Sequence, residues 1–403
     1  MRTEIRSEYS EMLYRTITST LKRLILPRGN HNTIFDAGAP LIVAGTFRTS
    51  NGIGRAAVGC YHALKELGLN PIAVDLSEGF NQVDQHSPIP LHPPHVSHRG
   101  TAIIYANPPE LERALMLLKI RRWHNWRIIG AWVWELPISP IEWQPQVDLV
   151  SEIWAPSTFV QNAFESAYAA RVKRVPHFVK LDQTACIARA ETISKKQPFE
   201  VLALADGRSS FYRKNILAAV DVFKRAFSSN EPAQLTIKTR NLSLFSEFET
   251  RLRQETDADS RIKIIDQSMS YPNLLSLIAK NHVLLSTHRA EGFGITLAEA
   301  MSLGTIAVAT NWSGNTDFMN ENNSVPLPYS LNQVIDPSQV YARNSAHWAN
   351  VDIDQAARLL RRLWLSADLR NSLSEKAKAD ILSALSARNY GDALGINDAS
   401  NPT

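Results

Sequence analysis

Two glutamates flank a glycine-containing turn in the second half of the chain, and together they suit a ligand that carries both phosphate and hydroxyl groups. Glu291 precedes Gly292 and Gly294, and Glu299 follows eight residues after Glu291. An apolar run before the turn predicts a buried strand, and residues 295–301 predict a helix. Glycines let the backbone approach a ligand, and a helix N-terminus presents free N–H groups to phosphate oxygens. Carboxylates accept hydrogen bonds from vicinal hydroxyls, so we expect hydroxyl contacts on both flanks of a phosphate site.

A basic loop in the same half of the chain supplies positive charge. Residues 206–215 (DGRSSFYRKN) lie between a predicted strand and a predicted helix and contain Arg208, Arg213 and Lys214. Cations at a helix N-terminus oppose the helix dipole, so a bound anion is the expected compensation. A solvated basic loop is the alternative interpretation.

The first half of the chain offers two further segments. Gly52, Gly54 and Arg55 lie between the first predicted strand and its helix, where glycines permit close approach of a ligand. Trp134 and Glu135 end another predicted strand, and the Glu135 carboxylate is suited to accepting a proton or orienting a hydroxyl.

Strands that alternate with helices must position these residues. The predicted strands fall in two series, at 41–45, 71–74, 101–105, 127–134 and 152–155, and then at 199–205, 235–238, 261–265, 283–286 and 305–310. Helices are predicted at 56–67, 214–227, 271–279 and 354–385. Such alternation predicts α/β architecture with two parallel sheets, each covered by helices on both faces. We expect four parts: an N-terminal amphipathic arm at 1–35, two Rossmann-like domains at 36–192 and 193–375, and a C-terminal helix with a disordered tail at 376–403.

Length and composition agree with this division. A chain of 403 residues exceeds one compact core and suits two domains. The net charge of +4 is a weak bias that does not argue for nucleic acid. Two cysteines, Cys60 and Cys186, are too few for a disulfide framework and favour a reducing compartment. We expect no transmembrane helix and no cleaved signal peptide.

The N-terminal arm has apolar residues at helical spacing and several arginines and lysines. Such a basic amphipathic helix is suited either to an anionic membrane surface or to packing on its own domain or a partner chain.

Several segments together resemble the retaining nucleotide-sugar glycosyltransferases with the GT-B fold, and in particular glycosyltransferase family 4 (glycosyl transferases group 1). The two-glutamate motif lies in EGFGITLAEAMSLG at 291–304, followed by TIAVATNWSGNTDFM at 305–319. In the first half, GAWVWELPISPIEW at 130–143 and SEIWAPSTFVQNAF at 151–164 are also similar to that family. The resemblance covers most of residues 40–385. It implies two Rossmann-like domains that face each other across a cleft, with C-terminal helices crossing back.

The resemblance also implies roles for individual residues. Glu299 would hold the ribose of the sugar donor, Glu291 would contact the transferred sugar, and Arg208 and Lys214 match the spacing of an Arg–Lys pair that binds the diphosphate. Lys238 resembles a further position of the donor site. The predicted donor-binding set is Arg208, Arg213, Lys214, Lys238, Gly292, Phe293, Gly294, Ile295, Thr296 and Glu299. The predicted catalytic pair is Glu291 and Glu135, and the predicted acceptor-side loop contains Gly52, Gly54 and Arg55.

We therefore expect a hexosyltransferase that moves a sugar from a nucleotide diphosphate donor to a hydroxyl of a glycan or lipid-linked glycan. The resemblance implies retention of anomeric configuration, and fixed cations make a metal or other cofactor unnecessary. The expected location is the cytoplasm, including the inner face of the membrane if the arm binds there. No nucleic-acid partner is expected.

Other interpretations stay open at this point. Gly52-x-Gly54-x-x-Ala57 with Asp75 imitates the dinucleotide fingerprint of an NAD-dependent oxidoreductase, although six residues separate the strand end from Gly52. A non-catalytic sugar-binding protein and a sugar-nucleotide epimerase would use the same fold. The evenly spaced His92, His95 and His98 invite a metal interpretation, but nearby prolines favour a plain loop.

Overall fold

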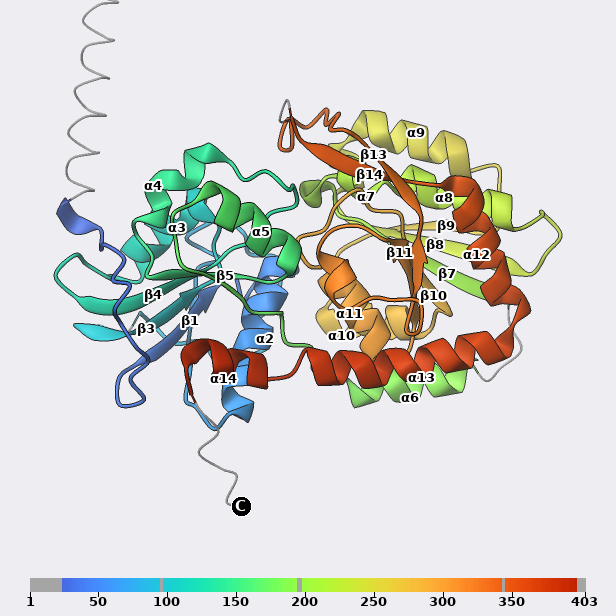
Figure 1. The fold of residues 1–403 in the computed structure, drawn as a ribbon. Helices are drawn as coiled ribbons and strands as arrows, with labels where there is room; N and C mark the ends of the chain where they lie inside the picture. Colours follow the sequence, from blue (N-terminus) through green and yellow to red (C-terminus); the bar gives the residue numbers. More distant parts are fainter. Residues whose placement is uncertain (1–23, 95–96, 194–197, 343–344, 397–403) are drawn as a thin grey trace, which may run out of the picture.

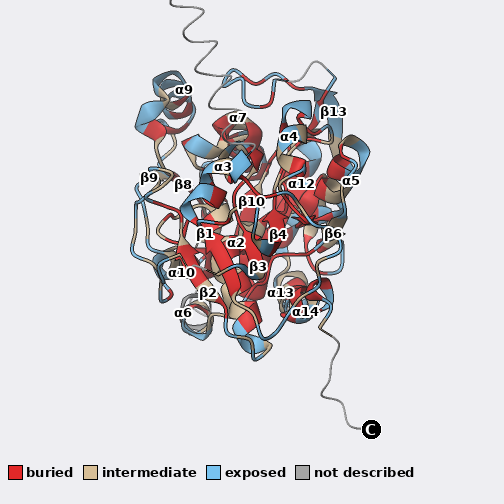
Figure 2. Cartoon of the chain, turned by 90° about the vertical axis from the view of Figure 1, so that its left-hand side faces the viewer, coloured by how far each residue is buried: buried red, intermediate tan, exposed pale blue. Residues whose placement is uncertain are grey.

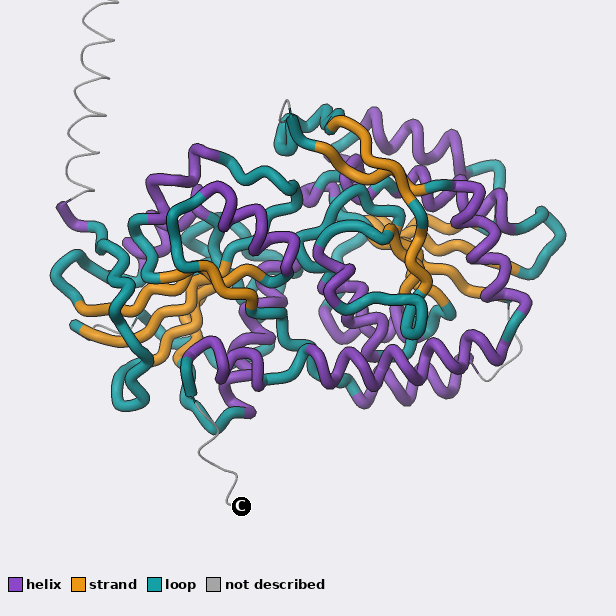
Figure 3. Tube along the Cα trace, viewed as in Figure 1, coloured by secondary structure: helices purple, strands orange, loops and turns teal. Residues whose placement is uncertain are grey.

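The computed structural model describes residues 24–94, 97–193, 198–342 and 345–396, which form two α/β domains side by side (Figure 1). Each domain is built on a six-stranded parallel sheet. Helices lie on both sides of each set of strands (Figure 3). The predicted α/β architecture with two parallel sheets is confirmed.

The first sheet has the strand order β2-β1-β3-β4-β5-β6. Its strands are β1 (Leu41–Gly45), β2 (Ile72–Asp75), β3 (Arg99–Ile104), β4 (Asn125–Ala131), β5 (Glu152–Ala155) and β6 (Val172–Arg174). The central strands are almost wholly buried (Figure 2), because helices cover both faces. This explains their continuous apolar runs, which lack the alternation of a half-exposed strand.

The helices of the first domain divide between these two faces. They are α2 (Gly52–Glu66), α3 (Pro108–Leu117), α4 (Gln144–Val147) and α5 (Thr158–Ala167), with the 3₁₀ turn η1 (Ile141–Trp143) before α4. One core joins α3, α4 and α5 to the sheet, and a second core joins α2 to the opposite face. Asn51 caps α2 by accepting from Gly54 N at 2.7 Å, and Ser157 caps α5.

The second sheet has the order β12-β11-β10-β7-β8-β9. Its strands are β7 (Phe199–Leu204), β8 (Ala233–Thr239), β9 (Ile262–Asp266), β10 (Val283–Ser286), β11 (Ile306–Thr310) and β12 (Val325–Leu327). The chain first builds outward from β7 through β8 to β9, and then returns to the other side of β7 with β10. Loops that leave adjacent strands in opposite directions create a crevice at the strands' carboxyl ends. Here that crevice lies between β7 and β10, and in the first sheet it lies between β1 and β3.

Helices also cover both faces of the second sheet. They are α6 (Gln183–Ile193), α7 (Phe211–Lys214), α8 (Ile216–Ala226), α9 (Ser246–Thr256), α10 (Tyr271–Ala279), α11 (Ile295–Ser302), α12 (Ile353–Leu365) and α13 (Ala367–Ala384). The 3₁₀ turns η2 (Gly207–Ser209), η3 (Leu242–Leu244) and η4 (Gly314–Asp317) lie in its loops. A hairpin of β13 (Tyr329–Gln333) and β14 (His347–Val351) leaves the domain before α12.

The chain crosses between the domains twice. Residues 175–182 lead from β6 to α6, which packs on α10 of the second domain; the boundary predicted at 192/193 falls at the end of α6. After α13 the chain returns, and α14 (Arg388–Leu394) packs on α2 in the first domain (Figure 1). The two crossings are joined by a backbone hydrogen bond from Val179 N to Leu385 O at 3.3 Å.

Four local predictions were wrong. The helix predicted at 354–385 is divided into α12 and α13, because Ser366 between them is extended and caps α13. The helix predicted from Lys214 to Phe227 is divided, because Asn215 has a left-handed φ of 53° between α7 and α8. Gly52, Gly54 and Arg55 lie within the first turn of α2 and not in the loop before it. Part of the C-terminal tail predicted to be disordered is helical to Leu394, because Tyr390 and Leu394 are buried against the first domain. Residues 397–403, and residues 1–23 of the predicted arm, lie outside the described residues.

Candidate active site

The crevice of the second sheet brings together the two segments that carry the predicted donor site. The loop after β7 contains Arg208, Arg213 and Lys214, and the loop after β10 contains Glu291. Arg289 N donates to Arg213 O at 2.8 Å, so the two loops run side by side. Residues that are 77 positions apart in sequence therefore meet at the carboxyl ends of neighbouring strands.

Lys214, Arg213 and Glu291 form a buried charge cluster at this point. Lys214 Nζ lies 2.5 Å from Glu291 Oε1, and Arg213 Nη1 lies 3.3 Å from Glu291 Oε2. Burial alone would raise the pKa of Glu291, but the charges of Lys214 and Arg213 lower that pKa to about 2. Glu291 is therefore ionised at neutral pH and serves as the counter-ion of two cations.

Arg213 is fixed more firmly than Lys214. Its guanidinium is 3% exposed and donates to Ala290 O at 2.7 Å and to Ser209 O at 3.0 Å. These two carbonyl groups set its orientation. Arg213 thus supplies a stationary positive charge, whereas Lys214 carries its charge on a flexible stem with Glu291 as its ion-pair partner.

Glu299 forms a second ion pair, and its partner comes from the first domain. Arg55 Nη1 contacts Glu299 Oε2, and Arg55 Nη2 donates to Thr296 Oγ1 at 3.0 Å. Tyr271 OH donates to Glu299 Oε1 at 3.1 Å. Burial raises the pKa of Glu299, and Arg55 and Tyr271 offset only part of that rise. Because α11 begins at Ile295, Glu299 lies about one turn into the helix.

The glycine turn between the two glutamates touches the first domain directly. Gly292 O accepts from Ser157 Oγ at 2.6 Å. A Cβ on Gly292 would lie 2.3 Å from Val133 Cγ1, so this position admits no side chain while the domains are in contact. Gly294 has a φ of 89°, a conformation that allows α11 to begin immediately after the turn. Phe293 is buried against the ring of His177, at a centroid distance of 4.7 Å.

Glu135 reaches the same cluster from the loop after β4. Arg213 Nη2 lies 3.7 Å from Glu135 Oε1, and Tyr341 OH donates to Glu135 Oε2 at 3.2 Å. The predicted catalytic carboxylate and the predicted donor-site cations therefore face each other across the domain contact. Sequence reasoning missed Tyr341 and Tyr271, because a tyrosine far away in sequence carries no local signal for a carboxylate partner.

The remaining predicted residues lie around this cluster. Arg208 is exposed on η2, and its guanidinium forms no ion pair with any described residue. Lys238 is buried, and its Nζ donates to Thr239 O at 2.8 Å. No contact joins it to Glu291 or Glu299 within the described ranges. Gly52 faces the start of α11: a Cβ on it would be 3.8 Å from Ile295 Cγ2. A Cβ on Gly54 would instead lie 2.5 Å from Thr46 O, so Gly54 serves local packing.

A further interdomain contact, which the sequence did not suggest, involves Arg240. Arg240 Nη1 lies 2.7 Å from Asp84 Oδ2 and contacts Ser50 Oγ, both in the first domain. The same guanidinium contacts Asp206 beside the basic loop. Ser50 N donates to Asp84 Oδ1 at 2.8 Å, so the first-domain side of the contact is itself ordered. We call Arg240, Asp84, Ser50 and Asp206 the interdomain clasp.

Asp75, the acidic residue of the dinucleotide-like pattern, is paired with Arg48 in the first domain. Asp75 Oδ2 lies 2.8 Å from Arg48 Nε, and Asp75 Oδ1 accepts from Phe47 N at 3.1 Å. The carboxylate thus orders the loop between β1 and α2. This use favours a structural interpretation of Asp75 over the ribose contact of an oxidoreductase.

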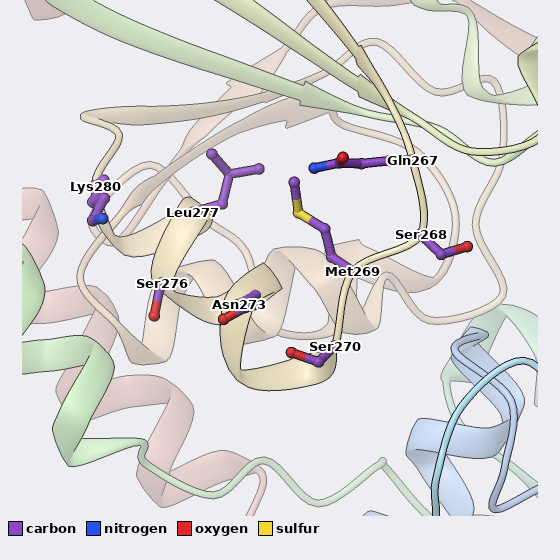
Figure 4. Close-up of a pocket in the computed structure, with 8 residues that line it drawn as sticks. All are labelled: Gln267, Ser268, Met269, Ser270, Asn273, Ser276, Leu277 and Lys280. Atoms are coloured by element: carbon purple, nitrogen blue, oxygen red, sulfur yellow. The ribbon is translucent and has the colours of Figure 1, made fainter.

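A hollow of 410 Å³ lies on the flank of α10 (Figure 4). Gln267, Met269 and Leu277 face one another across it. Its other lining residues are Ser268, Ser270, Asn273, Ser276 and Lys280. The hollow includes none of the charged residues of the cluster, and the chemistry of the cluster therefore does not depend on it.

Two findings concern metals and membranes. No three His, Cys, Asp or Glu side chains of the described residues are arranged to hold a metal ion. His92 and His98 are exposed, and His95 lies outside the described part of the chain. No helix within the described ranges has both the length and the apolar character needed to span a bilayer.

Comparison with known protein sequences finds glycosyltransferases. Residues 207–380 match the family described as Glycosyl transferases group 1. A putative glycosyltransferase of Sulfolobus islandicus filamentous virus is 26% identical over 194 residues, which are 48% of this chain and 50% of that protein. The match thus spans about half the length of that relative.

Solved structures resemble both domains together. Sucrose-phosphate synthase of Thermosynechococcus elongatus has a TM-score of 0.61 at 13% identity, over 90% of this chain and 100% of that chain. HepE of Anabaena, in complex with UDP and glucose, has a TM-score of 0.59 at 11% identity, with coverages of 90% and 100%. At such identities the likeness establishes the fold, which is GT-B. Residues 207–380 thus match the Glycosyl transferases group 1 family, in a chain with the GT-B fold.

Proposed function

We propose that this protein is a glycosyltransferase that moves a hexose from a nucleotide diphosphate sugar to a hydroxyl of a glycan or lipid-linked glycan. The observation that supports it most strongly is the buried cluster of Lys214, Arg213 and Glu291 opposite Glu135. A site of this kind holds fixed positive charge beside carboxylates that accept hydrogen bonds from hydroxyl groups. That combination matches a ligand with a pyrophosphate between two sugar rings.

Departure of the nucleoside diphosphate builds negative charge on a phosphate oxygen. Lys214 would bind that oxygen by leaving Glu291, while Arg213 keeps its place and its charge. Exposed Arg208 would bind the outer side of the diphosphate, and the N–H groups at the start of α11 would complete the contact. Because Arg213 and the N–H groups at the start of α11 are already positioned, they stabilise the transition state without reorganisation. We propose that they take the role of a metal ion, so the reaction needs none.

Glu291 and Glu299 then contact hydroxyls on either side of the diphosphate. Glu291, released from Lys214, would accept from hydroxyls of the transferred hexose. Glu299 would exchange Arg55 for the ribose hydroxyls. Glu135 lies on the first-domain side of the cluster, where it would orient the acceptor hydroxyl. We further propose that the acceptor attacks from the side of the leaving group, which retains the anomeric configuration.

Fold relatives support this class of substrate. HepE was solved with UDP and glucose, and a mutant of TarM from S. aureus was solved with UDP and α-GlcNAc-glycerol. The TM-score to the latter is 0.56 at 13% identity, over 75% of this chain and 56% of that chain. By analogy we propose a uridine diphosphate sugar as the first donor to test. Location in the cytoplasm, with the arm at 1–35 in contact with the membrane, is proposed on the sequence pattern alone.

The test is thermal stabilisation by a panel of UDP-, GDP- and ADP-sugars, followed by assay of nucleoside diphosphate release. A true donor raises Tm by mass action. Lys214→Ala should weaken donor binding about 10- to 100-fold, the range expected for a charge-assisted hydrogen bond. Lys224→Ala is the matched control, since Lys224 pairs with Glu255 on the exposed face of α8. The proposal fails if no nucleotide sugar stabilises the wild type, or if Lys214→Ala binds the donor as tightly as Lys224→Ala does.

A further inference from the structure

The loop that joins β13 and β14 belongs to the second domain in sequence but packs on the first. Val334, Tyr341 and Trp348 are buried in the same core as Trp134 and Trp143. Tyr341 is held in the loop by its backbone N–H, which donates to Asp336 Oδ2 at 2.9 Å. At the base of the hairpin, Arg289 Nε donates to Asn350 Oδ1 at 2.9 Å. The hairpin is thus tied to the loop after β10 at one end and to the first domain at the other.

Tyr341 lies where three functional elements meet. Its hydroxyl donates to Glu135 Oε2 at 3.2 Å. Its ring lies 5.5 Å from the ring of Trp134 and 5.7 Å from the guanidinium carbon of Arg213. Burial, with a further contribution from the charge of Glu135, raises the pKa of Tyr341 above its ordinary value. The hydroxyl is therefore a permanent hydrogen-bond donor, and the ring is a fixed wall of the site.

This arrangement decides which way the Glu135 carboxylate points. Arg213 Nη2 attracts Oε1 from 3.7 Å, a distance too long for a hydrogen bond, whereas Tyr341 holds Oε2 by a direct one. Without the hydroxyl, the carboxylate would be free to rotate toward Arg213 and pair with it. A carboxylate paired in that way is less able to accept a hydrogen bond from an incoming hydroxyl.

We propose that Tyr341 is a positioning residue that holds Glu135 away from Arg213 and toward the attacking hydroxyl. This inference rests on the proposed function and extends it, because it assigns the hairpin of the second domain a part in orienting the acceptor. Tyr341 acts only through Glu135, since its own hydroxyl is occupied by the carboxylate.

Tyr341→Phe tests the proposal, because phenylalanine keeps the ring that packs on Trp134 and Arg213 and removes only the hydroxyl. The assay is nucleoside diphosphate release from the stabilising UDP-sugar, with water or octyl glucoside as the acceptor. We expect kcat to fall about tenfold with either acceptor, while KM for the sugar donor stays within about twofold. Tyr329→Phe, which removes a hydroxyl from the same hairpin beside Trp312, should change neither constant.

A double-mutant cycle shows whether Tyr341 works through Glu135. In the Glu135→Ala background, Tyr341→Phe should have less than about a twofold effect on kcat. Equal tenfold losses of kcat in both backgrounds would overturn the proposal, as would an unchanged kcat in the single variant.

Asp336→Asn, which loosens the loop around Tyr341, provides a second test if Tyr341→Phe folds poorly, and it should also lower kcat. If the wild type turns over no nucleotide sugar, the proposed function fails; turnover with an unaffected Tyr341→Phe would remove only the present inference.

Discussion

Two buried ion pairs lie where the two domains meet. Lys214 with Glu291 and Arg55 with Glu299 are both paired at this contact. A buried ion pair gains little over an apolar pair of the same size, because each ion loses its hydration. Such pairs therefore add little to stability, but they suit a site in which a substrate group replaces one partner of the pair. Each cation could then bind an anionic group of the substrate, and each carboxylate could accept a hydrogen bond from a hydroxyl.

His177 gives a residue-scale prediction about pH. Burial, aided by the charge of Arg55, lowers the pKa of His177 to about 3, whereas an unfolded histidine titrates near 6.5. Between these values the unfolded chain binds one more proton than the folded protein, so stability falls as pH falls from about 6.5. At pH 5 the loss from this residue is about 2 kcal/mol. His282, whose pKa burial lowers to about 4, acts in the same direction.

We expect His177→Gln to reduce the decrease in Tm between pH 7.5 and pH 5, measured by differential scanning calorimetry. His92→Gln serves as control, since His92 is exposed in the loop before β3. An acid-induced decrease that is equally large in His177→Gln and wild type would contradict the assigned role of burial.

Sequence patterns could predict Glu291, Glu299 and Lys214 as site candidates, because each lies at a strand end or helix start. A local pattern could not predict which partners these residues pair with. Arg55 and Glu299 are 244 positions apart, and only the docking of two domains brings them together. The same reason explains why Arg240 and Tyr341 gave no signal.

At the scale of elements, the start of α11 carries the most constrained backbone of the site. Gly294 combines a φ of 89° with close neighbours: a Cβ there would be 3.2 Å from Asn315 Cβ and 3.3 Å from Leu297 Cδ1. The turn needs this conformation because the chain must leave β10, pass Gly292 close to the first domain, and enter a helix within a few residues. The same short turn therefore connects β10 to α11 and forms part of the candidate site.

Gly294→Ala should therefore destabilise the protein by about 2 kcal/mol, which is the sum of left-handed strain and crowding. Gly68→Ala is the matched comparison, since Gly68 has a φ of 75° with nothing near its Cβ position, and should cost only about 1 kcal/mol. Urea unfolding of the two variants measures the difference. Equal losses of unfolding free energy in the two variants would show that Asn315 and Leu297 move aside at little cost, which would contradict the crowding assigned to Gly294.

The elements themselves were largely predictable where they are buried on both faces. The strands at 152–155 and 283–286 and the helix at 271–279 have the predicted bounds, since continuous apolar runs and flanking breakers mark them. Short edge strands such as β6 and β12 have three residues each and no periodicity to detect. The hairpin of β13 and β14 was missed because β13 is mostly exposed and polar. Its burial comes from the loop that reaches the other domain.

At the scale of the whole molecule, the interdomain clasp should bias the domains toward contact. Asp84→Asn removes the first-domain charge but leaves the contact between Arg240 and Asp206 intact. The clasp lies near the surface, so we expect a loss of about 1 kcal/mol, or roughly a fivefold shift toward separated domains. Small-angle X-ray scattering would detect this as a larger radius of gyration. Asp354→Asn, which breaks an exposed pair with Arg225 inside the second domain, should leave the radius unchanged.

The hydrogen bond between Val179 and Leu385 ties both crossings of the chain together at one edge of the molecule. Two linkers fastened side by side permit rotation about their common line but resist sliding and twisting. Rotation about this line is therefore the domain motion that the two linkers favour. One pair of spin labels, one on each domain, would follow that rotation.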